Sequence, residues 1–215
     1  MGFFWRLCVP SSEDREKGDE TKYTWRDYAI KIFSTITNQH STATTIIFVN
    51  DPYDVIDSIK GEEHAKRNYV HGSKNVYIKA VDELQNKTNL SKNFTNKSNK
   101  IRSQNYLKME FQRLSQSYPK KTFIYSVQRN CEDLKTGTKL PSYECNHQEA
   151  DTIMFFIIHA LRQVGNDSTI VIDAEDTDVI ALSYFASHQE NGVLGIRRKK
   201  SIFDCNKYLP QSLHR

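Results

Sequence analysis

Two pairs of acidic residues in the C-terminal part of the chain have the types and spacing that could bind a metal ion. Glu149 and Asp151 stand at the start of an expected helix, and Asp176 and Asp178 follow the next expected strand. Carboxylates repel one another, so a cluster of them is costly unless a cation lies between them. Oxygen ligands of this kind suit Mg²⁺ or Mn²⁺. The pattern therefore predicts a divalent cation held by carboxylates, as in sites that cleave phosphodiesters.

A fifth candidate ligand, Asp51, lies far upstream in the chain. It follows the apolar run at 45–49 and precedes Pro52, which predicts a buried parallel strand that ends in a turn. Ligands of alternating α/β folds bind at the carboxyl ends of the parallel strands. We therefore expect four carboxyl groups to converge within roughly 8 Å at that sheet edge, those of Asp51, Glu149, Asp176 and Asp178.

Each of these acids also has a purely structural interpretation. Asp51 suits a turn before Pro52, and Asp176 is a good N-cap residue. Glu149 and Asp151 favour a helix N-terminus electrostatically. Capping needs one carboxylate at each helix end, however, whereas both later pairs supply a second acid two residues away. The conjunction favours a shared cation site over separate caps.

A group of basic residues follows the first expected strand. On its own, a lysine-rich helix is usually a solvated face. Downstream of an acidic strand end, such a helix can instead hold the phosphate of a nucleic acid against a bound cation. The candidates for this contact are Lys60, Lys66, Arg67 and Lys74. A second basic run, at 197–200, is interpreted as an exposed turn.

The elements that must position these side chains alternate between helix and strand. Apolar residues recur at helical spacing over 25–39, with Thr24 as N-cap, over 149–164, and after Asp176. Apolar runs predict strands at 45–49, 122–127 and 169–172, and a final hairpin brackets 197–200. This order predicts an α/β fold with three layers, α/β/α, around a mainly parallel central sheet. The polar segment 86–105 is expected to be a flexible, solvated excursion, with order returning at Leu107.

Composition limits the class of protein. The chain has 215 residues, 38% of them hydrophobic, enough for one core, so 1–215 is expected to form a single domain. The four cysteines form no CxxC pair, which favours a reducing intracellular compartment and gives Cys131 and Cys145 no standard zinc spacing. The apolar N-terminal stretch is short and contains Arg6, so it fits neither a signal peptide nor a membrane span. A formal net charge of +4 permits nucleic acid as a partner.

Four motifs, taken in order, resemble the flap endonuclease branch of the PIN-like nucleases. They are Asn50-Asp51-Pro52, the run at 58–67, Glu149-Ala150-Asp151 and the segment at 174–178. More closely, the acidic run at 13–19, followed by Tyr23-Thr24-Trp25 and by 49–54, is similar to a group of animal PIN-like proteins often linked to mobile elements. That similarity extends over nearly the whole chain.

The resemblance implies a PIN-like fold and a divalent-metal-dependent nuclease, intracellular or nuclear, that acts on DNA or RNA by a two-metal mechanism with Mg²⁺ or Mn²⁺. It makes the metal ligands Asp51, Glu149, Asp151, Asp176 and Asp178. It also assigns Lys60 and Arg67 to the reacting phosphate. Relatives begin with an earlier strand that carries another Asp and continue into a further acidic motif, so this chain is expected to be truncated at both ends.

Two other functions remain open from the sequence. Loss of the terminal segments would favour a non-catalytic module that keeps the fold and binds nucleic acid or protein. A phosphatase of the haloacid dehalogenase type is suggested by Asp176-Thr177-Asp178, which imitates the nucleophile motif of that family. That motif should follow its strand immediately and lie near the N-terminus, so we disfavour the phosphatase.

Overall fold

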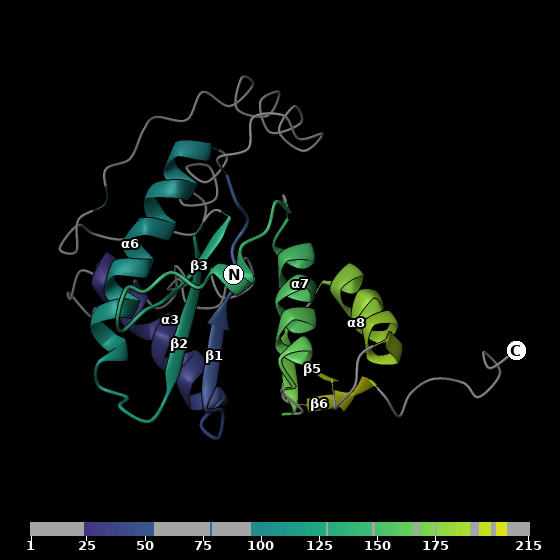
Figure 1. The fold of residues 1–215 in the computed structure, drawn as a ribbon. Helices are drawn as coiled ribbons and strands as arrows, with labels where there is room; N and C mark the ends of the chain where they lie inside the picture. Colours follow the sequence, from purple (N-terminus) through teal and green to yellow (C-terminus); the bar gives the residue numbers. More distant parts are fainter. Residues whose placement is uncertain are drawn as a thin grey trace, which may run out of the picture. The chain divides into compact units, whose positions relative to one another are not determined.

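The computed structural model of the chain describes two compact units, residues 1–148 and 149–215, each in part (Figure 1). The elements carry the labels of Figure 1. The described residues are 24–53, 78, 96–127, 129–147, 149–165, 168–174, 176–189, 194–198 and 201–205.

The first unit opens with helix α3, Trp25–Gln39, which begins as the sequence predicts. Thr24 and Asp27 form a reciprocal cap: the Asp27 N–H donates to Thr24 Oγ1 at 3.2 Å, and the Thr24 N–H donates to Asp27 Oδ2 at 2.9 Å. These hydrogen bonds hold the pKa of Asp27 below its usual value. The predicted apolar stripe is buried in full, at Trp25, Tyr28, Ala29, Ile32, Phe33 and Ile36.

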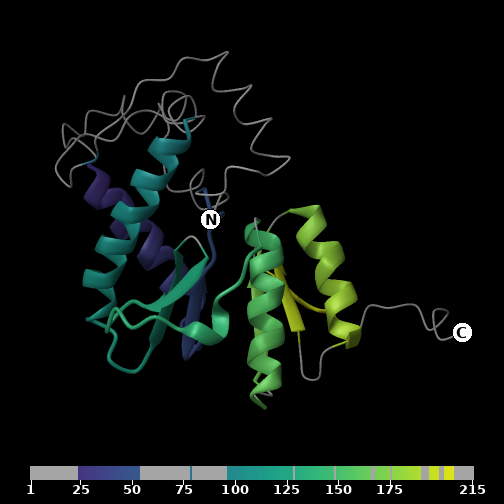
Figure 2. The ribbon, with the colours of Figure 1, turned by 45° about the horizontal axis from the view of Figure 1, so that its top comes forward.

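The sheet of the first unit has the strand order β1-β2-β3. β1 (Thr45–Phe48) runs parallel to β2 (Thr122–Val127), and β3 (Asn130–Asp133) adds to β2 as an antiparallel hairpin strand. Helices α3 and α6 (Lys97–Ser115) pack against each other (Figure 2). Their aromatic rings reach the sheet, because the Phe33 centroid lies 5.0 Å from that of Phe123 and the Phe111 centroid lies 4.9 Å from that of Phe48.

Helix α6 begins earlier than the sequence suggested. Asn96 caps it by accepting a hydrogen bond from the Ser98 N–H at 2.9 Å. The expectation of a flexible excursion over 86–105 is therefore wrong from residue 97 onward, while 86–95 lie outside the described residues. The cause is that polar residues occupy the buried side of its first turns: Asn99 and Ser103 are 1% and 0% exposed. Ser103 Oγ donates to the Lys100 carbonyl at 2.8 Å, so burial leaves that hydroxyl satisfied.

The second unit has a sheet of order β4-β5-β6, formed by β4 (Ile170–Asp173), β5 (Leu194–Arg198) and β6 (Ser201–Asp204). β4 and β5 are parallel, and β6 pairs with β5 as the predicted antiparallel hairpin. Helices α7 (Ala150–Gln163) and α8 (Thr177–Gln189) lie beside this sheet (Figure 2). One buried cluster joins all four elements of the unit's parallel half, through Ile158, Ile172, Val179 and Leu194.

The buried side of helix α8 is not its most apolar side. Val179, Ser183 and Ser187 are buried, whereas Leu182 is 40% and Phe185 is 64% exposed. The buried positions follow the four-residue spacing that keeps side chains on one helix face.

The described elements of both units follow the same order: helix, strand, helix, parallel strand, antiparallel strand. The predicted α/β class is confirmed. Each sheet is mixed rather than mainly parallel, because the β2-β3 and β5-β6 hairpins each add an antiparallel strand. Whether the two units form one domain with three layers stays a prediction.

Across the described ranges, no helix combines the length and the apolar character needed to cross a membrane.

Candidate functional site

Asp51 lies just beyond the carboxyl end of β1, and its carboxylate is exposed. Tyr53 Oη donates to Asp51 Oδ2 at 3.3 Å, and Gln104 Nε2, from α6, donates to the Asp51 carbonyl at 3.2 Å. Burial and the negative charge of Asp51 raise the pKa of Tyr53 well above its usual range. The phenol therefore keeps the proton that it donates. Asp51 is thus held through both its carboxylate and its main-chain carbonyl.

A buried hydrogen-bond network behind Asp51 fixes the end of β1. The Asn50 N–H donates to Ser126 Oγ at 2.7 Å, and Asn50 Nδ2 donates to the Ser126 carbonyl at 3.1 Å. Tyr125 Oη donates to the Gln104 carbonyl at 3.0 Å, and Gln104 in turn reaches Asp51. Strands β1 and β2 and helix α6 thus position Asp51 together.

One acceptor in this network has no partner. Asn50 is 3% exposed, yet its Oδ1 forms no hydrogen bond with any residue of the chain that the structure describes. The amide orientation is set by Nδ2, which faces the Ser126 carbonyl, so a flipped amide would set two acceptors against each other. An amide oxygen and a carboxylate at one strand end are hard oxygen donors, so the chemistry of this edge fits Mg²⁺ or Mn²⁺.

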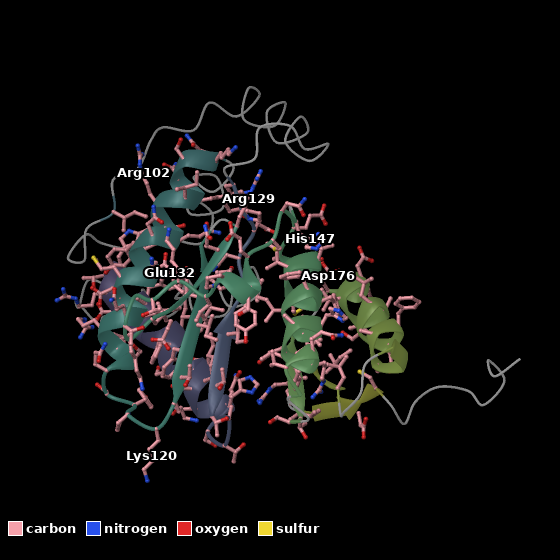
Figure 3. The ribbon with its side chains drawn as sticks, viewed as in Figure 1. Arg102, Lys120, Arg129, Glu132, His147 and Asp176 are labelled. Carbon is pink, nitrogen blue, oxygen red and sulfur yellow. The ribbon has the colours of Figure 1, made fainter. Side chains whose placement is uncertain are left out.

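In the second unit, Asp176 caps α8 as predicted. Its Oδ1 accepts a hydrogen bond from the Asp178 N–H at 3.0 Å, and its carbonyl accepts one from the Ile180 N–H at 3.1 Å. Both Asp176 and Asp178 are exposed at the start of α8, where Figure 3 labels Asp176. A carboxylate has about four acceptor sites, so one capping bond does not exclude a cation.

Glu149 occupies the N-cap position of α7 but does not use its side chain to cap. The cap is made by its main chain, because the Glu149 carbonyl accepts the Ile153 N–H at 3.0 Å and Thr152 Oγ1 at 2.9 Å. Its backbone is extended, with φ −132 and ψ 142, so Glu149 stands before the first helical residue. Residues i and i+2 of a regular helix point roughly 200° apart. Only this position lets Glu149 and Asp151 face one site.

An ion pair at the carboxyl end of β4 was not predicted. Asp173 and Arg197 are opposite residues of the parallel pair β4-β5, and Asp173 Oδ2 lies 4.0 Å from Arg197 Nε. Their side chains are 19% and 16% exposed, so the expectation of an exposed turn at Arg197 was wrong. The signal for Asp173 was its place directly after the apolar run of β4, where a strand end was already expected.

The structure does not bring the whole predicted site together. Four of the predicted residues, Lys60, Lys66, Arg67 and Lys74, lie outside the described residues. Among the residues that are described, no group of three or more His, Cys, Asp or Glu side chains could hold a metal ion. Convergence of Asp51 with the acids of the second unit therefore stays a prediction.

Comparison of the chain with protein-family models, with curated proteins and with solved structures found no match. Function must therefore be inferred from the chain's own residues.

Proposed function

We propose that the chain forms a divalent-metal-dependent nuclease domain that cleaves phosphodiester bonds in DNA or RNA. One observation carries the proposal: in each unit, acids stand at the carboxyl end of the first strand of a parallel pair. Asp51 follows β1. Asp173 is the last residue of β4, and Asp176 follows that strand. This edge is where parallel α/β sheets bind their ligands.

We assign these acids to a PIN-like domain with three layers, α/β/α. Its ligands are Asp51, Glu149, Asp151, Asp176 and Asp178, all of them oxygen donors. Three features of the described residues support this set. Asp51 is held by Tyr53 and Gln104, Glu149 stands before the first helical residue of α7, and Asp176 uses one oxygen for its cap.

The bound Mg²⁺ or Mn²⁺ would supply a more acidic water and stabilise the leaving oxygen. The chain's own residues would do the remaining work. Tyr53 orients the Asp51 carboxylate by donating to it, a role that outer hydrogen bonds commonly fill for metal ligands. Lys60 and Arg67 are proposed to neutralise charge on the phosphate. An enzyme of this kind would act inside the cell, including the nucleus.

The test compares cleavage by variants that keep their shape but lose one charge. Purified protein is incubated in Mn²⁺ with single-stranded, nicked and flap DNA and with RNA. We expect Asp51→Asn and Asp176→Asn each to slow cleavage about a hundredfold or more, because each removes a metal ligand. Glu144→Gln, at an exposed carboxylate after the 3₁₀ turn at Pro141–Tyr143, is the matched control and should cleave like wild type. Equal cleavage by wild type and both ligand variants would remove the assignment.

A second candidate is a non-catalytic module that binds nucleic acid or protein. The observation that favours it is the lack of a three-ligand group among the residues that the structure describes. A Mn²⁺ titration separates the two functions, because a bound cation stabilises the folded protein by linkage. No rise in Tm at millimolar Mn²⁺, together with nucleic-acid binding, would favour the binding module.

A further inference from the structure

The first half of helix α6 lies directly against the Asp51 segment. Gln104 Nε2 donates to the Asp51 carbonyl at 3.2 Å, and Lys100 Nζ lies 4.8 Å from the centroid of the Tyr53 ring. Both contacts come from the first half of the helix, whose bounds are Lys97–Ser115. Lys97 lies on the same side as Lys100 and Gln104 by helical spacing, so this side of the helix adjoins the strand end to which a cation is assigned.

This half of α6 is strongly cationic. Lys97 and Lys100 are partly exposed, and the sequence of α6 contains no acid before Glu110. Arg102 stands two residues after Lys100 and therefore points to the other side of the helix. The N-terminal end of a helix also carries a partial positive charge from its unpaired N–H groups. Side chains and backbone thus contribute charge of the same sign at the same place.

A third cation comes from the sheet. Arg129 is exposed just beyond β2, and the parallel pairing of β1 with β2 brings the carboxyl ends of both strands to one edge. Figure 3 shows Arg102 and Arg129 toward one end of the first unit, with Lys120 at the opposite end. Lys120 precedes β2, at the amino edge of the parallel pair.

We infer that Lys97, Lys100 and Arg129 form a cationic face that binds the phosphate backbone of a nucleic-acid strand alongside Asp51. The inference rests on the proposed function, which makes Asp51 a cation ligand. Arginine pairs with phosphate oxygens bidentately, and lysine acts as a point charge with three donors. Three cations outnumber the Asp51 carboxylate at this edge, so their net charge attracts a phosphodiester.

The test measures binding without cleavage. A fluorescein-labelled single strand of about 20 nucleotides, as DNA and as RNA, is titrated with the full chain in EDTA, and anisotropy is followed between 50 and 200 mM KCl. The triple variant Lys97→Gln, Lys100→Gln, Arg129→Gln should bind about tenfold more weakly. Its slope of log affinity against log salt should fall by about 2, since each single-strand phosphate contact contributes about 0.7.

Two single variants provide a matched comparison. Arg129→Gln should weaken binding and lower the salt slope, whereas Lys120→Gln, an equal charge change at the other edge, should do neither. Thermal melts of all variants establish that each one is folded. An unchanged affinity and slope for the folded triple variant, or an equal loss for Lys120→Gln, would overturn the inference.

The outcome for the cationic face is separable from that for the nuclease. Loss of binding in the triple variant would support the face even if wild type cleaves nothing, and the nuclease proposal would then fail alone. Cleavage by wild type with unchanged binding by the triple variant would refute the face alone. Equal losses for DNA and RNA would identify the phosphate backbone as the shared recognition element, and a loss for one of them would name the substrate class.

Discussion

Replacing Ser126 by alanine should destabilise the first unit by more than the loss of one hydroxyl group suggests. Ser126 Oγ accepts the Asn50 N–H at 2.7 Å, and the two residues are 2% and 3% exposed. The substitution leaves a buried main-chain donor without its acceptor, which costs about 1–3 kcal/mol. For a chain of this size, about 2 kcal/mol corresponds to a fall in Tm of roughly 4–8 °C.

The matched control is Ser103→Ala, which removes the same atom from a site with 0% exposure in the same unit. Ser103 Oγ donates to a helix carbonyl and accepts no main-chain N–H in the described hydrogen bonds, so its loss leaves no buried donor stranded. We expect a change below about 0.5 kcal/mol there. Urea denaturation followed by circular dichroism measures both variants. Equal stability of Ser126→Ala and Ser103→Ala would refute the network that we describe behind Asp51.

Three further predictions concern other described residues. Lys121 Nζ donates to the carbonyls of residues 40, 41 and 43, which follow α3. Lys121→Met should therefore lower the free energy of unfolding by about 1.5–3 kcal/mol, as measured by urea denaturation. An unchanged free energy would contradict a stabilising role for these hydrogen bonds. Hydrogen bonds from Thr24 hold the pKa of Asp27 below its usual value, so its contribution to stability should be present above the pKa of the unfolded chain and lost as pH falls through the folded pKa. Asp27→Asn should flatten this acid limb of the stability curve, and an unaltered limb would argue against it. Burial raises the pKa of Cys131 to about 12, so an aromatic disulfide reagent at pH 8 should modify Cys145 well before Cys131. Peptide mass spectrometry measures the order of modification, and earlier modification of Cys131 would contradict its burial.

Local signals in the sequence were sufficient for most element boundaries. Helix α3 was predicted completely because its capping residue and its apolar spacing lie within one short segment. Strand β2 was likewise predicted from the run of mainly apolar residues at 122–127. The start of α6 was missed because Asn99 and Ser103 are polar, and their burial depends on how α6 packs rather than on residue type.

The candidate site was less predictable, because its contacts join residues that are distant in sequence. The acids at strand ends were found from the sequence, and Asp176 caps α8 as expected. Nothing local indicates that Asn50 would bond to Ser126, or that Asp173 would face Arg197, since both pairings depend on strand register. Register depends on the whole sheet, which residue spacing alone does not determine.

The central claim is that acids at the strand ends hold a divalent cation, and the Mn²⁺ affinity of charge-neutralised variants tests it most directly. Isothermal titration is done on wild type, Asp51→Asn and Asp176→Asn, with Glu144→Gln as control. The account predicts that each ligand substitution weakens Mn²⁺ binding at least tenfold and that the control binds like wild type. Wild-type Mn²⁺ affinity in both ligand variants would contradict the claim.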